Sequence, residues 1–299
     1  MAKIITVFGA TGLQGGSVVR ALLKDPRYQV RAVTRHPKSK KAKALKELGV
    51  EVVKGDLDNE DSVKAAMLGS YGVFGVTNYF EYVDEQREFM QGKVMADAAK
   101  SVGVKHFIYS SLEKVVEEFG KPCGHFDAKG RVEDYMIEVG LPVTCVRYAE
   151  FMETIIREQF IILKMADGTR VIDMPTGDAT YDWISAAGAG TAITAIFDEP
   201  SEFIGKTIGI SGDRLSTPEC AQILSKHFPQ WIFKASTETP DEFSKRGFQG
   251  AEELAVMFEY FQTGKFTRDL ELTRRLDPNT QTFEQWVVAN KDDLEKVFK

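Results

Sequence analysis

The sequence is poor in the residues that build disulfide frameworks and metal sites. Its 299 residues include only three cysteines, Cys123, Cys145 and Cys220, and four widely separated histidines. Cysteines at this spacing form neither a disulfide framework nor a CxxC pair, and the histidines show no HExxH spacing. We therefore expect reduced thiols and no metal site.

Long hydrophobic runs and an excess of positive charge are also missing. No stretch has 18 consecutive apolar residues, and the chain begins in a predicted strand without the apolar segment of a signal peptide. The formal net charge is −6, whereas a nucleic-acid-binding surface is basic. These absences argue against a membrane protein and against direct nucleic-acid binding. They predict a cytoplasmic location, with the nucleus as a second compartment.

The first turn of the chain, in contrast, is rich in glycine. Ile4–Phe8 is β-branched and aromatic enough for a strand covered on both faces, and Gly9, Gly12 and Gly15 follow before an amphipathic helix. These glycines permit a sharp turn, a close approach of backbone N–H groups to a pyrophosphate, and tight packing of the helix on the sheet. The strand before and the helix after them predict a dinucleotide site. The alternative is a tight turn without a ligand.

The residue that ends the second predicted strand indicates which dinucleotide is bound. Tyr28–Thr34 is followed by Arg35, at the position where an acidic residue would bind the ribose 2′-OH of NAD. Arginine favours a 2′-phosphate instead, and Lys38, Lys40 and Lys41 add positive charge. We therefore expect NADP(H), although a solvated basic loop is the alternative for the lysines.

Polar residues follow the next strands as well. Asp56 comes after the predicted strand Val50–Val53, where a carboxylate can bind the adenine amino group, and Asp58 is expected to cap the next helix or the turn, without a functional role. Asn78 follows the predicted strand Gly72–Val76 and is placed for the ribose or the nicotinamide half of the cofactor.

Strand and helix patterns alternate through the first half of the chain. With strands at Val104–Ser110 and Thr144–Tyr148, six strand–helix units predict an α/β fold with a Rossmann-type, doubly wound parallel sheet. Residues 1–150 are the expected NADP(H)-binding domain. Residues 151–299 are expected to form a smaller α+β domain that covers the cleft, with some segments returning to the sheet.

Several local expectations concern the connections and the second half. Leu112–Gly124 is expected to be irregular, and helices are expected over Arg131–Val139, Glu150–Leu163 and Thr282–Lys296. Turn signals within Met165–Asp182 predict a small hairpin.

The catalytic position of short-chain dehydrogenases is altered in this chain. Those enzymes place an acid–base tyrosine four residues before a lysine, with a strand-end serine nearby. Here the strand ends in Ser110 and Ser111 and the lysine is Lys129, but His125 stands where the tyrosine would be. His125 is either a proton relay or an ordinary helix-start residue, and Lys129 is either a ribose ligand or a catalyst. Cys123 is either a reactive thiol or an inert one, and the inert thiol is the simpler interpretation.

Seven segments give the chain a resemblance to a known family. It resembles the NmrA-like group of atypical short-chain dehydrogenases, and within it the animal proteins that act as NADPH sensors. The segments are Val7–Val18 (VFGATGLQGGSV), Val33–Pro37 (VTRHP), Gly55–Asp58 (GDLD), Val76–Phe80 (VTNYF), His125–Gly130 (HFDAKG), Pro175–Asp178 (PTGD) and Gly247–Tyr260 (GFQGAEELAVMFEY).

This resemblance implies an NADP(H)-binding redox sensor with a regulatory protein partner, a possible homodimer, and little or no oxidoreductase activity. The alternative is an NADPH-dependent reductase of quinones or other small electrophiles. Ala149–Glu153 departs from the family pattern. Together, the resemblance and the motifs predict cofactor contacts by Gly9, Ala10, Thr11, Gly12, Leu13, Gln14, Gly15, Arg35, His36, Lys38, Ser39, Asp56, Leu57, Thr77, Asn78, Tyr79, Lys129, Glu150, Phe151, Met152 and Glu153.

Overall fold

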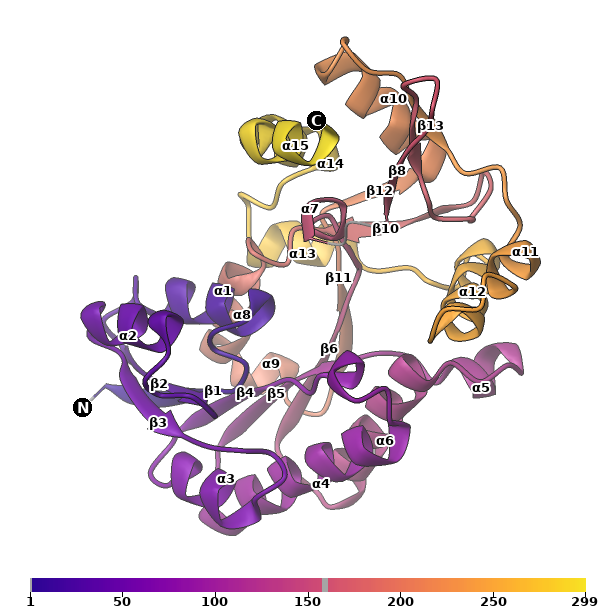
Figure 1. Ribbon diagram of the computed structural model, residues 1–299. Coiled ribbons are helices and arrows are strands. Elements are labelled where there is room, and N and C mark those ends of the chain that lie inside the picture. The colour runs from indigo at the N-terminus through magenta and orange to yellow at the C-terminus, as the bar shows by residue number, and fades with distance from the viewer. Residues whose placement is uncertain (1, 158–160) are drawn as a thin grey trace.

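Seven parallel strands form the central sheet of the protein (Figure 1). The computed structural model describes residues 2–157 and 161–299. The strand order is β11-β6-β5-β4-β1-β2-β3, and it reverses between β1 and β4. The expected doubly wound α/β sheet is therefore confirmed, and sheets of this kind bind ligands at the carboxyl ends of their strands beside the reversal. The strands are β1 (Lys3–Val7), β2 (Tyr28–Thr34), β3 (Glu51–Lys54), β4 (Gly72–Gly75), β5 (His106–Ser111), β6 (Val143–Tyr148) and β11 (Thr207–Ile210).

Helices cover both faces of this sheet. One face carries α3, α4 and α6, and the other carries α1 beside α8 (Figure 1). Burial from both sides explains why the strands are apolar runs. The helices of the first half are α1 (Leu13–Leu22), α2 (Lys40–Glu47), α3 (Glu60–Met67), η1 (Tyr79–Glu81), α4 (Glu85–Val102), α5 (Val115–Phe119) and α6 (Gly124–Glu138), where η1 is a single 3₁₀ turn.

The second half of the chain builds two small three-stranded sheets with orders β12-β10-β7 and β13-β9-β8. Their shared core is dominated by large aromatic side chains, among them Trp183, Tyr181 and Trp286. The strands are β7 (Glu150–Phe151), β8 (Ile162–Lys164), β9 (Arg170–Ile172), β10 (Thr180–Ile184), β12 (Asp213–Ser216) and β13 (Phe233–Ala235).

The helices of the second half surround these small sheets and reach back to the large one (Figure 1). Among the described residues, no helix has the length and apolar character needed to cross a membrane. The helices are α7 (Thr154–Arg157), α8 (Gly190–Asp198), α9 (Pro200–Phe203), α10 (Thr217–His227), α11 (Pro240–Ser244), α12 (Ala251–Gln262), α13 (Leu270–Leu276), α14 (Phe283–Ala289) and α15 (Lys291–Phe298).

Two contacts join the halves tightly. A Cβ atom on Gly190 of α8 would lie 2.1 Å from the carbonyl oxygen of Ser17, so glycine is required where α8 meets α1. A buried ion pair places Arg268 Nη1 2.5 Å from Glu113 Oε1. β11 is a strand of the large sheet and α8 packs on α1 beside it. The large sheet and its covering helices therefore contain residues from both sides of the expected boundary at residue 150.

The helix expected over Glu150–Leu163 is wrong for most of its described residues. β7 pairs with β10 and β8 pairs with β9, so long-range pairing overrides the local apolar pattern, and α7 is the one helix among the described residues between them. Residues 158–160 of the expected helix lie outside the described residues. The β8–β9 hairpin turns at Asp167 and Gly168, as expected, although its first strand lies before Met165.

Three other boundaries differ from the expectations. Leu112–Gly124 contains the short helix α5, and α6 begins at Gly124 instead of Arg131, which places the whole HFDAKG segment on one helix. The helix expected over Thr282–Lys296 is two helices, α14 and α15, which meet at Asn290. Helix ends of this kind depend on contacts that a single-sequence pattern does not contain.

Candidate functional site

The glycine turn has the geometry of a backbone cradle. Gly9 has a φ of +63°, and a Cβ atom on Gly15 would lie 2.4 Å from the Gly9 carbonyl oxygen. Gly12 is the N-cap of α1 and has no side chain that could cap the helix. All residues of α1 are described, and its first turn carries no acidic residue. The first-turn N–H groups and the positive end of α1 are thus arranged for an anion.

Arg35 lies at the carboxyl end of β2, where the sequence predicts a phosphate contact. Its guanidinium forms an ion pair with Glu81 of η1, and Nη1 lies 3.5 Å from the hydroxyl of Tyr82. His36 and Lys38 are exposed beside it. Ser39 is the N-cap of α2, because its hydroxyl accepts a hydrogen bond from Ala42 N at 3.2 Å.

The residues after β3 lie at the same edge of the sheet. Asp56 and Leu57 are half-buried, and Oδ1 of Asp56 accepts a hydrogen bond from Asp58 N at 3.2 Å. Of the two alternatives for Asp58, the cap of the next helix is wrong. Asn59 caps α3, whereas the Asp58 carboxylate lies 2.6 Å from Arg87 Nη2 and accepts a hydrogen bond from Gln91.

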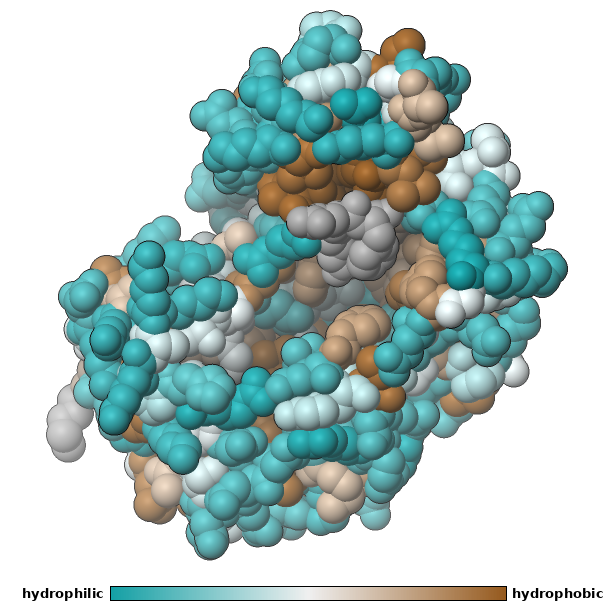
Figure 2. All heavy atoms as spheres, in the orientation of Figure 1, coloured by the Kyte–Doolittle hydropathy of each residue, from teal (hydrophilic) through white to brown (hydrophobic). Residues whose placement is uncertain are grey.

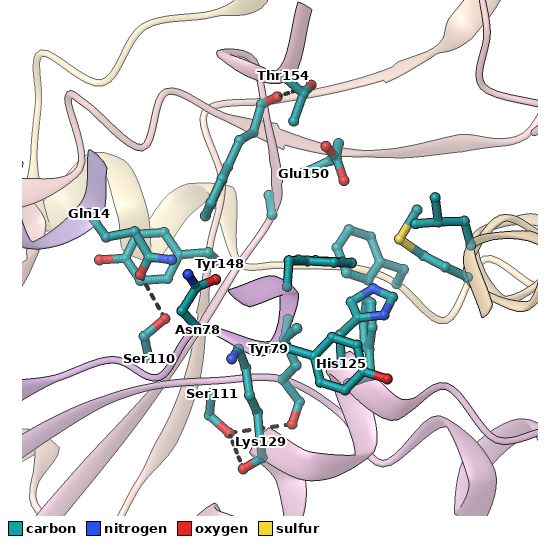
Figure 3. Close-up of a pocket in the computed structure, with 18 of the residues that line it drawn as sticks. Gln14, Asn78, Tyr79, Ser110, Ser111, His125, Lys129, Tyr148, Glu150 and Thr154 are labelled. Carbon is teal, nitrogen blue, oxygen red and sulfur yellow. Dashed lines mark hydrogen bonds between the residues drawn. The ribbon is translucent and has the colours of Figure 1, made fainter. Parts of the chain in front are cut away.

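A cavity of about 290 Å³ lies at the carboxyl ends of β4, β5 and β6 (Figure 3). The space-filling view shows a deep hollow between the two parts of the molecule (Figure 2). Most of the lining is aromatic or aliphatic, and polar groups come chiefly from the sheet side. The lining residues are Gln14, Thr77, Asn78, Tyr79, Phe80, Ser110, Ser111, Leu112, His125, Phe126, Lys129, Tyr148, Ala149, Glu150, Phe151, Thr154, Ile161, Met174, Leu254, Met257, Phe258 and Phe266.

The predicted cofactor residues fall into three groups. The glycine turn and the Arg35 region lie at the expected adenosine side, whereas seven predicted cofactor residues line the cavity, namely Gln14, Thr77, Asn78, Tyr79, Lys129, Glu150 and Phe151. The catalytic candidate His125 lines it as well. Met152 and Glu153 do not reach it. Met152 is fully buried in the core of the second half. The Glu153 carboxylate accepts hydrogen bonds from Ser185 Oγ at 2.7 Å and from the backbone of the following loop.

Lys129 is held by a buried counter-ion that the sequence did not reveal. Its ammonium forms an ion pair with Glu88 of α4, whose side chain is 1% exposed, and lies 3.2 Å from Thr77 Oγ1. Thr77 Oγ1 in turn donates to Glu88 Oε1 at 2.5 Å. Glu88 Oε2 is buried and has no hydrogen-bond partner among the described residues. A paired ammonium on the cavity wall is a hydrogen-bond donor and not a base.

His125 is bound to an acidic residue from the second half. Both its Nδ1 and its backbone N, the latter at 2.7 Å, contact Glu253 Oε1 of α12. Tyr79 Oη donates to Glu253 Oε2 at 2.7 Å. Burial raises the pKa of Glu253, but the hydrogen bonds from His125 and Tyr79 outweigh it and leave this pKa below its ordinary value of 4.5. The carboxylate is therefore ionised at neutral pH.

Cys123 completes a small cluster with this pair. Its Sγ lies 3.6 Å from His125 Nδ1, and ligand atoms of Cys123, His125 and Glu253 lie within 4.8 Å of one another. These donor types suit zinc. However, burial and the Glu253 charge raise the pKa of the Cys123 thiol, and Nδ1 is already bonded to the carboxylate. Of the two alternatives that the sequence left for Cys123, the burial and the contacts therefore favour the protonated, inert thiol.

Two strand-end hydroxyl groups also line the cavity. Ser110 Oγ donates to Gln14 Oε1 at 2.7 Å (Figure 3). Ser111 Oγ donates to Glu133 at 2.5 Å. The Tyr148 hydroxyl is buried and has no partner within the described part of the chain. Burial also raises its pKa, so it remains a donor. An unpaired buried hydroxyl at a cavity is a candidate ligand contact, and the sequence marked it only as the end of a strand.

Comparison with known proteins identifies relatives of the whole chain. The model of the NmrA-like family matches residues 1–287. The NmrA-like family domain-containing oxidoreductase malD of Malbranchea aurantiaca is 35% identical over 233 residues, covering 72% of this chain and 69% of that protein. The oxidoreductase FrzB of Cladobotryum sp. is 30% identical over 287 residues, covering 88% and 85%.

Solved structures share the fold at lower identity. NmrA, described as a negative transcriptional regulator, has a TM-score of 0.80 at 24% identity and covers 96% of this chain and 94% of its own. It has also been solved with NAD and with NADP. The triphenylmethane reductase of Citrobacter sp., solved with NADP(H), has a TM-score of 0.79 at 22% identity, covering 95% and 99%.

These relatives support the resemblance to the NmrA-like family as a whole and not the one to its animal members. The two curated relatives are fungal oxidoreductases, so they do not support the narrower resemblance to animal NADPH sensors. The family model spans nearly all of the sequence, and both relatives match over more than two thirds of their own length. The protein belongs to the NmrA-like family.

Proposed function

We propose that this protein binds NADP(H) along the carboxyl edge of the large sheet and reduces a small apolar electrophile, such as a quinone, in the adjoining cavity. The observation that carries this proposal is the cavity itself, about 290 Å³ of mainly apolar space with Lys129 and His125 on its wall. Ligand pockets have this composition, and the volume lies at the small end of their range.

The glycine turn fits the cofactor's pyrophosphate. A Cβ atom on Gly12 would lie 3.2 Å from the Gly9 carbonyl oxygen, and α1 offers its first turn without a side-chain cap. Arg35 is positioned for a 2′-phosphate, and the unpaired hydroxyl of Tyr148 offers a hydrogen bond at the cavity end. The NADP(H) complexes of NmrA and of triphenylmethane reductase add support, because both share this fold.

The residues of the cavity suit a reduction. Bound NADPH would supply the hydride for this chemistry. Lys129 would donate a hydrogen bond to the ribose or to the electrophile's oxygen, and the aromatic wall formed by Phe80, Phe126 and Phe258 would exclude water. The named activity of the fungal relatives favours turnover over binding alone.

A regulatory role is the second candidate, and the Arg35–Glu81 ion pair favours it. A 2′-phosphate would compete with Glu81 for Arg35, and Glu81 belongs to η1 together with Tyr79, which is bonded to α12. The cofactor would therefore bias the position of η1 and of the second half, as a sensor requires. In this case we expect a protein partner or a homodimer, in the cytoplasm or the nucleus.

The decisive experiment follows NADPH oxidation by the purified protein with a panel of quinones and other small electrophiles. Leu254→Trp fills the cavity and should lower kcat/KM at least about 10-fold, as an overfilled apolar pocket does, while NADPH affinity stays unchanged. Leu68→Trp, on an exposed leucine far from the cavity, is the matched control.

Two outcomes separate the candidates. Turnover that Leu254→Trp reduces and Leu68→Trp does not would support the reductase. NADPH binding without turnover on any acceptor would contradict it. A protease-cleavage pattern that differs between NADPH and NADP⁺ would then support the regulatory role.

A further inference from the structure

We propose that His125 and Glu253 form a proton-donating pair, in which Nε2 of His125 delivers the proton of the reduction and Glu253 is its positioning residue. This inference rests on the proposed reductase function. Its two members come from α6 in the first half and α12 in the second half, which meet at the cavity. The pair would replace the tyrosine that is missing four residues before Lys129.

The first step is the orientation of the imidazole. Glu253 is an ionised carboxylate and can only accept, so the bond between His125 Nδ1 and Oε1 places the hydrogen on Nδ1. The backbone N of His125 donates to the same oxygen at 2.7 Å, and the Tyr79 hydroxyl occupies the other oxygen at 2.7 Å. With each carboxylate oxygen engaged, Glu253 holds one tautomer and one ring orientation.

The second step concerns the free nitrogen. His125 lines the cavity (Figure 3), and among the described residues no hydrogen bond is found at its Nε2. The rings of Phe80 and Phe126, with centroids 5.1 and 4.9 Å from that of His125, restrict its rotation. A restrained ring with one engaged and one free nitrogen has the arrangement of the histidine in a hydrolase triad, with the carboxylate in the orienting role.

The third step is the charge around the ring. Glu253 faces it from α12, Tyr79 from η1 and Cys123 from the N-cap of α6, and Lys129 follows one turn along α6. Burial raises the pKa of Tyr79 and of Cys123, so both stay neutral in the physiological range. Lys129 is paired with Glu88. Of these groups, Glu253 is the charged one in direct contact with the ring, and its charge is what the variants below change.

The proton balance of the reaction then closes. Bound NADPH would supply a hydride from its C–H bond to the carbon of a carbonyl group and become NADP⁺, and the C=O π electron pair would move to the oxygen. That oxygen would take the proton from His125 Nε2. His125 would be left neutral, with its Nδ1–H still hydrogen-bonded to Glu253, and would take a new proton from solvent. General acid–base catalysis of this kind contributes about 10²- to 10⁴-fold.

Three substitutions of Glu253 separate its charge from its geometry. Glu253→Gln keeps an acceptor oxygen but loses the charge, Glu253→Asp keeps the charge, and Glu253→Leu removes both. Glu252→Gln makes the same change of charge at an exposed neighbour and is the control. His125→Gln should lower kcat by about 10²-fold or more, the size of a lost general acid, with NADPH affinity unchanged.

The expected readouts differ among the variants. In Glu253→Gln, kcat should fall and its dependence on pH should change, because the amide removes the negative charge that touches the ring. Glu253→Asp should restore part of the wild-type profile, and Glu252→Gln should leave it unchanged. Nitrogen NMR of His125 without cofactor should show the Nδ1–H tautomer in wild type and in Glu253→Gln, and a tautomer mixture in Glu253→Leu.

The results that overturn the inference are distinct. A kcat–pH profile that is the same in wild type and Glu253→Gln, with turnover intact, overturns the pair and leaves the reductase function standing. An Nε2–H tautomer of His125 in the wild type would also overturn the pair and leave the reductase function standing. Wild-type protein that binds NADPH but reduces no acceptor overturns the reductase function and this role together.

Discussion

The two ends of the candidate site are held together in different ways. The adenosine end consists of backbone at Gly9–Gly15 and of exposed charge at Arg35, all within the first strand–helix–strand unit. The cavity end consists of buried pairs, Lys129 with Glu88 and His125 with Glu253, whose members lie far apart in the chain. We infer that the adenosine end determines which cofactor binds. The chemistry at the cavity end depends on ion pairs that form only when the chain is folded.

Breaking the buried pair at the cavity end should have the largest effect. Lys129→Met leaves the Glu88 carboxylate buried without a counter-ion and should lower the free energy of unfolding by about 3–5 kcal/mol. Urea denaturation measures this loss. The double variant Lys129→Met with Glu88→Leu should recover most of it, since no charge is left unpaired. A double variant as unstable as the single one would show that the pair does not carry the effect.

At the adenosine end, Arg35→Ala should change selectivity and not stability. Loss of hydrogen bonds to a charged group costs about 1.5–3 kcal/mol, which is roughly 10- to 100-fold in NADPH affinity, whereas NADH affinity should be unaffected. Stability should change by at most about 1 kcal/mol, because Arg35 and Glu81 form a partly exposed ion pair. Thermal shifts with each cofactor provide the measurement, and equal losses for NADPH and NADH would contradict the 2′-phosphate assignment.

Glu81→Gln tests the same contact from the other side. Removing the carboxylate that competes for Arg35 should tighten NADPH binding, by no more than about 1 kcal/mol, or roughly 5-fold. A weaker affinity for NADPH would mean that Glu81 supports the cofactor instead of competing with it. Calorimetric titration of both proteins distinguishes the two.

The glycine turn should respond sterically. Gly15→Ala places a Cβ atom 2.4 Å from the Gly9 carbonyl oxygen. It should lower the free energy of unfolding by about 1–3 kcal/mol and should also weaken NADP(H) binding. Gly16→Ala is the matched control, because its Cβ would lie 3.4 Å from the nearest atom, the Ala10 carbonyl oxygen. Denaturation and cofactor titration of the two variants check the difference.

The smallest expected effect is a pH dependence at the cavity end. The folded pKa of Glu253 lies below 4.5, so its stabilising contribution is fully present above that value and is lost as the pH falls through the folded pKa. Melting temperatures of wild type and Glu253→Gln should therefore differ at neutral pH and converge in acid. A difference that persists at the lowest pH would point to a cause other than the carboxylate charge.

Much of the fold could be read from local patterns. Strands of the large sheet are apolar runs between turn signals, and the residues at their ends, such as Arg35 and Asn78, were found because the strand ends share one edge. The prediction was wrong at Glu150–Leu163, where β7 and β8 form because of partners in β10 and β9. Pairing with distant strands overrides a local helical pattern.

The candidate site divides in the same way. His125 and Lys129 were recognised from their spacing, whereas Glu88, Glu253 and Tyr148 were not, because nothing near them in sequence marks an acidic or hydroxyl group that folding will bury. Met152 and Glu153 follow β7, shortly after the end of β6, yet Met152 lies in the core and the Glu153 carboxylate is bonded to the neighbouring loop. Position after a strand indicates an edge of the sheet and not the direction of a side chain.

The sequence alone determined the cradle. Gly9 acts through its positive φ, and Gly12 and Gly15 act through close contacts with Gly9, so their role follows from spacing in a strand–turn–helix. Tertiary structure decided the chemistry at the other end, because α4 and α12 supply the carboxylates that orient Lys129 and His125. Charge pairing in a buried site depends on distances through space, which the order of residues does not specify.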